Sequence, residues 1–221
     1  MAIKLNLEKL NNEIQSVMDT ITKAGAEVQN IAGFADVFTD QHRKGLVEKV
    51  EQNYTTAIQE ALNGMKEQIK SDADRAKVTR EIDFAEQTYY ATAVKQEIEG
   101  LTTKQLIERY PDIVARGNEP MKKEFERLAV AMMKNAGDDS SVITFKQKMY
   151  QNMTEAEKDA EDTRAASEMF LYNVGIIEQQ ANRILRAALS GEKANAAELI
   201  TIWEQGKENA ERNVESVAKL V

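Results

Sequence analysis

The sequence is poor in the residues that most often carry chemistry or interrupt helices. It contains no cysteine, one histidine, two prolines and 6% aromatic residues in a chain of 221. The absence of cysteine excludes disulfides, thiolate zinc sites and cysteine nucleophiles, and it fits a cytoplasmic protein. The single histidine excludes the two-histidine HExxH site and the paired Glu-x-x-His motifs of di-iron bundles. We expect His42 to be a surface residue at a helix start.

Other signatures of function are missing as well. The ten glycines are scattered, so neither a phosphate-binding loop nor a dinucleotide-binding loop is present. Charged residues interrupt every apolar run well short of the ~20 residues that a membrane span needs, and we expect no signal peptide. The formal net charge of -8 opposes binding to nucleic acid or anionic lipid. We expect no catalytic residue, metal site or cofactor.

What the sequence does contain is a regular heptad pattern in its first 31 residues. Its a positions are Leu7, Ile14, Ile21 and Val28, and its d positions are Ile3, Leu10, Val17, Ala24 and Ile31. The pattern predicts one long helix from about residue 3 to about residue 31. The flanking positions do not pair Glu with Lys, so we expect the seam to pack inside the chain. An intermolecular coiled coil is the alternative.

The rest of the chain predicts further helices, six to eight in all. Two long helices are expected over 41–70 and 72–99, divided by a capping signature at Ser71 and Asp74. A capping box at Thr102 and Gln105 opens a short helix that Pro111 is expected to end. No period-two strand pattern occurs. The predicted fold class is all-α, an elongated multi-helix bundle or antiparallel long hairpins with coiled-coil-like packing and no sheet.

We divide the chain into three regions that form one continuous bundle. Residues 1–100 are the N-terminal long-helix region, 101–120 an irregular hinge with a short helix, and 121–221 the C-terminal helical region. The hinge is a place for a specific contact, because loops carry function more often than the framework does.

Six residues are candidates for contact with another protein. Phe34 and Phe38 beside Gly33 predict a corner packed into the core, with an exposed anchor as the alternative. Trp203 is likewise expected in the core, with an interface anchor as the alternative. The full set is Phe34, Phe38, Pro111, Arg116, Asn118 and Trp203.

In composition the chain is similar to internal scaffolding and core proteins of tailed phages, which tend to be acidic, helical and free of cysteine. The leading hypothesis is a non-enzymatic structural or assembly protein. It would act through contacts with copies of itself or with a larger partner, in the cytoplasm of the producing or host cell or within a virion. The alternatives are an adaptor or inhibitor that binds one target through 111–120, and a carboxylate-based enzyme. The enzyme requires two or three acids buried together without basic partners.

Overall fold

The computed structural model describes residues 4–76, 84–192 and 194–219, and it confirms the all-α fold class. Within these ranges there are eight helices and no strand. The described helices include none with the length and apolar character that crossing a bilayer requires. The helices are α1 (Leu7–Gly33), α2 (Asp40–Ala76), α3 (Phe84–Ile98), α4 (Thr103–Ala115), α5 (Glu119–Asn135), α6 (Asp139–Gln151), α7 (Glu155–Leu189) and α8 (Glu198–Lys219).

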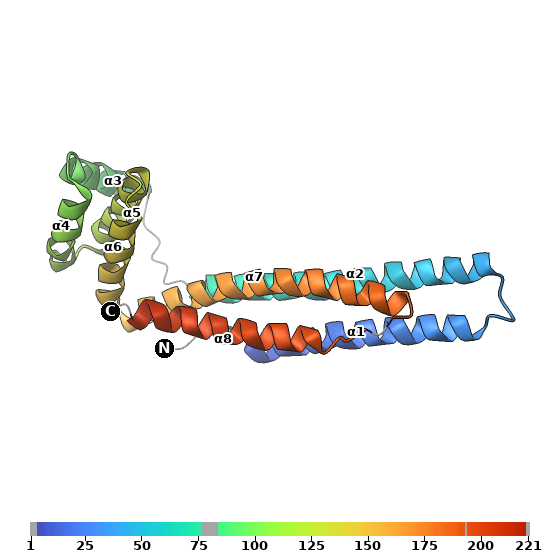
Figure 1. The fold of residues 1–221 in the computed structure, drawn as a ribbon. Coiled ribbons are helices and arrows are strands. Elements are labelled where there is room, and N and C mark those ends of the chain that lie inside the picture. The colour runs from blue at the N-terminus through green and yellow to red at the C-terminus, as the bar shows by residue number, and fades with distance from the viewer. Residues whose placement is uncertain (1–3, 77–83, 193, 220–221) are drawn as a thin grey trace. The chain divides into compact units, whose positions relative to one another are not determined.

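The chain divides into two compact units. The long-helix unit comprises residues 1–77 and 159–215, and the short-helix unit comprises residues 78–158 and 216–221. The long-helix unit contains α1, α2 and most of α7 and α8, as Figure 1 shows. The short-helix unit contains α3 to α6 and interrupts the long-helix unit between α2 and α7. This division follows spatial contact and differs from the three consecutive regions expected from the sequence.

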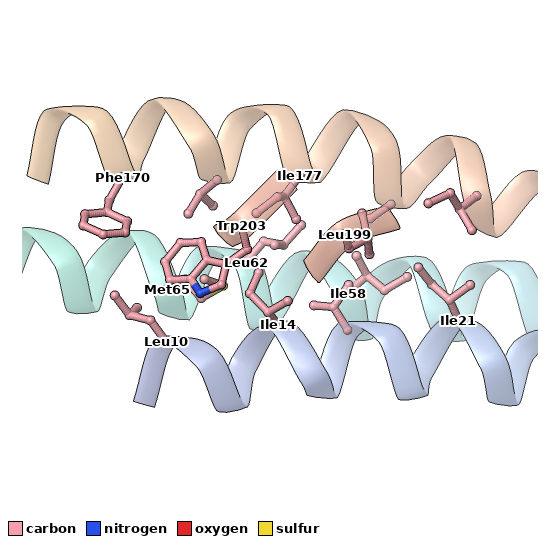
Figure 2. Packing of buried hydrophobic residues seen from close by; sticks show 14 of the residues in the cluster. Leu10, Ile14, Ile21, Ile58, Leu62, Met65, Phe170, Ile177, Leu199 and Trp203 are labelled. Carbon is pink, nitrogen blue, oxygen red and sulfur yellow. The ribbon is translucent and has the colours of Figure 1, made fainter. Parts of the chain in front are cut away.

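The heptad seam of α1 forms one wall of the long-helix core. Its buried residues lie in one cluster with apolar residues of α2, α7 and α8 (Figure 2). Each fully buried Leu, Ile or Val contributes about 1.5–3 kcal/mol relative to an exposed one. The seam therefore packs within the chain, as the lack of Glu–Lys pairs at its flanking positions predicted. The buried seam residues are Leu10, Ile14, Val17, Ile21, Ala24 and Val28.

The predicted break between two helices at Ser71 is wrong, because α2 continues to Ala76. Asp72, where the second helix was expected to begin, is only 7% exposed. Its carboxylate accepts a hydrogen bond of 3.0 Å from the backbone N–H of Asn6. A second bond of 2.7 Å comes from the side-chain amide of Gln68. A side chain at the predicted helix break thus makes a contact with a distant segment of the chain. The apolar positions Val78 and Ile82 of the expected second helix lie outside the described residues.

The entry to α1 is also set by side-chain hydrogen bonds. The helix begins at Leu7 rather than near residue 3, which lies outside the described residues. Asn6 is the N-cap, and its side chain accepts from the backbone N–H of Lys9 at 3.0 Å. One residue earlier, Leu5 is buried in the core cluster.

In the short-helix unit, Pro111 lies inside α4 and does not end it, so this prediction is also wrong. The predicted capping box at Thr102 and Gln105 is present and starts the helix. Proline removes one backbone donor, but Tyr110 and Ile113 on either side are fully buried and hold the helix together. The expected long loop shrinks to a tight turn, which ends at Gly117 with a positive φ of 66°.

The core of the short-helix unit is built around three aromatic rings. Tyr110 of α4 contacts Phe145 of α6 edge-on, with ring centroids 5.1 Å apart. Phe125 of α5 lies 6.3 Å from both rings. Such pairs add to the burial of the side chains themselves. Further apolar residues of α3, α4, α5 and α6 complete this second core.

Candidate functional site

Catalysis and metal binding both need several reactive side chains gathered at one place. Within the described ranges, no three His, Asp or Glu side chains gather closely enough to hold a metal ion. A hollow of about 670 Å³ lies between α3 and α5. It is open, and its charged lining includes Glu124 and Arg127, which form an ion pair with each other at 2.5 Å. This hollow gathers no general acid, base or nucleophile in a shielded setting.

The candidate interaction residues Phe34 and Phe38 lie at the turn that joins α1 to α2. The prediction of a corner packed into the core is wrong for Phe34, which is 53% exposed. Val37 is 70% exposed, and Phe38 is half-buried. The ring of Phe38 lies 6.0 Å from that of Phe34 and 4.9 Å from that of His42. The turn thus presents an aromatic cluster at the surface. An exposed anchor, the alternative prediction for these two residues, would lie at such a position.

The cover over the α1–α2 hairpin ends before this turn. Gly25 of α1 faces Ala188 near the end of α7, at 3.4 Å from an ideal Cβ position. In Figure 1 the hairpin continues past the connection between α7 and α8. We call residues 28–50 the hairpin tip. The burial of the seam weakens along it, from 1% exposure at Ile21 to 9% at Val28 and an intermediate value at Ile31.

Along α2, too, the exposure of the apolar residues increases toward the turn. Leu62 is fully buried and Ile58 is 2% exposed. Val50 is 9% exposed and Val47 only half-buried. Two helices in contact bury only the stripe between them. In the hairpin tip, where α7 and α8 do not cover the hairpin, some apolar side chains of α1 and α2 are only half-buried.

Trp203, by contrast, is in the core and is not available as a surface anchor. It is 1% exposed, and its ring lies 5.1 Å from that of Phe170. The indole N–H donates to the side-chain carbonyl of Asn11 at 2.5 Å. Figure 2 shows the indole pointing into the space between the helices. The buried tryptophan therefore joins α8 to α1 and α7.

The three candidates of the predicted hinge are engaged in structural contacts. Pro111 lies within α4, as described above. The Arg116 guanidinium donates two hydrogen bonds to the Glu97 carboxylate, at 2.6 and 2.8 Å. These bonds, with others from Arg109, lower the pKa of Glu97. Asn118 is the N-cap of α5 and accepts from the Met121 N–H at 3.0 Å. Arg116 and Asn118 therefore hold helices in place, while Arg116 remains exposed and Asn118 half-buried.

Sequence reasoning missed a buried polar cluster between α4 and α5. The Tyr110 hydroxyl donates a hydrogen bond to Glu126. Burial raises the pKa of Glu126, and burial followed by this hydrogen bond raises the pKa of Tyr110. Lys122 is only 7% exposed, and its ammonium group lies 3.4 Å from Glu119. The missed signal is spacing, because Lys122 lies three residues before the core residue Phe125 and so shares its stripe.

This cluster ties helices together and does not meet the condition set for a carboxylate enzyme. That condition was two or three buried acids without basic partners. Here Lys122 opposes the effect of burial on the pKa of Glu126. At Glu157, burial acts to raise the pKa, but hydrogen bonds from Thr154 and the charge of Lys122 lower it. An acid with a lysine neighbour and a tyrosine donor is a satisfied buried network.

No protein-family model matches the chain, and comparisons with curated proteins and with solved structures give no match.

Proposed function

We propose that the chain is a non-enzymatic structural or assembly protein that acts through protein–protein contacts, and that the hairpin tip makes these contacts. The observation that carries the proposal is the exposure of Phe34 and Val37. A turn between antiparallel helices is usually built from Gly, Asn, Asp or Ser. A polar residue would serve such a turn as well as the large, mostly exposed apolar side chains of Phe34 and Val37. In water they favour contact with another apolar surface.

The scaffold beneath the tip supports this role. α1 and α2 are 27 and 37 residues long, and a shared apolar core holds both over much of their length. A tip on such a support loses little conformational entropy on binding, which favours affinity. The Phe34–Phe38–His42 contacts restrict the aromatic side chains further.

As the setting we propose virion assembly, with action in the cytoplasm of the producing or host cell. The support is the acidic, cysteine-free composition and the predominance of long helices. The adaptor alternative, with contact through residues 111–120, is less favoured because Arg116 and Asn118 hold their own helices in place.

The proposal is tested on the full chain by light scattering and chemical cross-linking at micromolar concentration, together with pull-downs from the producing cell. We expect a self-associated or partner-bound species that is lost in the variant Phe34→Ser/Val37→Ser. The matched control is Ile143→Ser, since Ile143 is an apolar residue of the short-helix unit that is 55% exposed. A chain that stays monomeric and captures no protein contradicts the proposal.

A further inference from the structure

We infer that the occupant of the hairpin tip is the hairpin tip of a second copy of this chain, packed antiparallel. This inference rests on the proposed function and names its partner. Two features of the described residues favour a second copy of this chain over an unrelated protein.

The first feature is the continuity of the seam. From Leu10 to Val28 the seam of α1 belongs to a core shared with α2, α7 and α8. α7 ends at Leu189, and nearer the turn Ile31 of α1 and Val47 of α2 are only half-buried. These half-buried positions can be covered by two more helices in the same bundle geometry. The hairpin tip of a second copy is a pair of helices with matching half-covered positions, so two tips complete one four-helix section.

The second feature is a charge pattern that is complementary to itself. Lys44, Glu48 and Glu51 follow one another at spacings of four and three on α2, so they share one helix face. All three are exposed. The basic residue lies nearest the turn, and the two acids lie one and two helical turns further from it. When two such faces meet antiparallel, Lys44 of each copy comes opposite Glu48 and Glu51 of the other.

This arrangement has the symmetry that a homodimer needs. A two-fold axis between the tips uses the same surface on both copies and closes the assembly. The aromatic residues Phe34 and Phe38 of one copy then lie against the α1–α2 groove of the other. Both copies thereby cover the apolar positions that α7 and α8 leave open. The whole chain has a net charge of -8, and the opposing charges on this face offset the repulsion between copies.

The test uses two charge variants of the full chain that are designed as partners. Lys44→Glu makes the face wholly acidic, and Glu48→Lys/Glu51→Lys makes it wholly basic. Each variant alone would place like charges opposite each other, so we expect its dimer to dissociate at least about tenfold more readily at low salt. Mixed in equal amounts, the two variants should recover association to about the wild-type level. Sedimentation velocity measures all three samples, with circular dichroism as the check on helix content.

The control is Glu60→Lys, an exposed acid on α2 between Ile58 and Leu62, which belong to the core shared with α7 and α8. It should leave association unchanged. The inference is overturned if each charge variant associates like the wild type, or if mixing restores nothing. A wild-type monomer that captures another protein through Phe34 and Val37 also overturns it but leaves the proposed function standing. A monomer that captures nothing contradicts both.

Discussion

The carboxylate of Asp72, near the end of α2, accepts a hydrogen bond of 3.0 Å from the backbone N–H of Asn6, which directly precedes α1. Two residues away, the backbone N–H of Lys4 donates to the hydroxyl of Thr163 on α7 at 3.1 Å. A three-residue segment thus joins three helices whose sequence positions lie far apart. The residues next to Asp72 and Thr163 in sequence do not indicate that these side chains bind the segment before α1. The contact therefore depends on the tertiary structure.

The Asp72 contact should contribute measurably to stability. We expect Asp72→Ala to lower the free energy of unfolding by about 1–3 kcal/mol, because the Asn6 N–H and the Gln68 amide both lose their acceptor. Urea denaturation followed by fluorescence measures it, since Trp203 is the one tryptophan and lies in the same unit. The control Glu67→Ala, at an exposed position of α2, should change little. Equal stabilities of both variants would show that the Asn6 contact is dispensable.

The close approach of α8 to α7 depends on the absence of a side chain at Gly206. A Cβ placed there would lie 1.8 Å from the side-chain nitrogen of Asn173 and 2.5 Å from its Cγ. Asn173 is 5% exposed and has little room to move. We therefore expect Gly206→Ala to destabilise the long-helix unit by about 1–3 kcal/mol, as measured by thermal and urea unfolding.

Gly64 offers the matched control for this substitution. It lies within α2, is exposed, and has nothing within 4 Å of its ideal Cβ position. Gly64→Ala should therefore stabilise the unit by roughly 0.5–1 kcal/mol. The double variant Asn173→Ala/Gly206→Ala should recover part of the loss, since it removes the clashing side chain. If Gly206→Ala were as benign as Gly64→Ala, the close packing of α7 and α8 would be refuted.

The half-buried acid Glu126 should give the short-helix unit an unusual dependence on pH. Burial raises its pKa in the folded state, so the ionised form opposes folding and the folded unit binds the proton more tightly than the unfolded chain. Its unfavourable contribution is present at neutral pH and disappears as the pH falls through the raised pKa. Stability should therefore rise on mild acidification. It falls again below the ordinary glutamate pKa of about 4.3, because Glu97 has a lowered pKa and loses its arginine contacts on protonation.

The variant Glu126→Gln separates the pH dependence caused by Glu126 from that of the other acidic residues. The neutral amide can still accept from the Tyr110 hydroxyl, and it carries no charge to desolvate. We expect it to be at least as stable as the wild type at pH 7 and to lack the rise on mild acidification. Denaturation followed by the near-ultraviolet circular dichroism of tyrosine measures both. Glu108→Gln, an exposed position on α4, is the control. A loss of stability at pH 7 would show instead that the negative charge beside Lys122 is needed.

The short-helix unit should be removable without unfolding the long-helix unit. The two points of the long-helix unit between which the short-helix unit is inserted lie near each other. Asp72 of α2 and Thr163 of α7 both bind backbone N–H groups of the same short segment, those of Asn6 and Lys4. A flexible linker of about eight residues spans up to roughly 26 Å and should suffice to join residue 76 to residue 159. We expect a helical chain with cooperative unfolding and unchanged fluorescence of the buried Trp203. A non-cooperative or molten product would mean that the long-helix unit requires the interruption.

The pattern of the sequence was enough to predict the helices, and it also located several of their ends. The capping box at Thr102 with Gln105 is present as predicted, and Thr154 with Glu157 forms a second one at the start of α7. Both rest on residues three apart, so local chemistry decides them. At Ser71 and Pro111 the same local rules failed. In both places buried contacts made with distant residues outweighed the local preference for a cap or a break.

The candidate surface could be predicted only in part. Phe34 and Phe38 stood out beside Gly33, but an aromatic pair at a corner is consistent with a core position as well as with an exposed one. The outcome depended on how far α7 and α8 extend along the hairpin, and no residue near the turn encodes that length. Trp203, equally ambiguous in sequence, is buried because α8 is among the helices that cover the seam.

The sequence by itself determined that this protein is helical, since the spacing of apolar residues at three and four is a local property that any compact structure must satisfy. It also determined the heptad seam of α1, but it left two alternatives for the partner of that seam, within the chain or in another copy. Only the tertiary structure decided that α3 to α6 form a separate unit and that the cover stops near Gly25. It also decided that Lys122 is buried and Glu126 half-buried. Each of these depends on which distant surfaces meet, and burial and pairing arise only once they do.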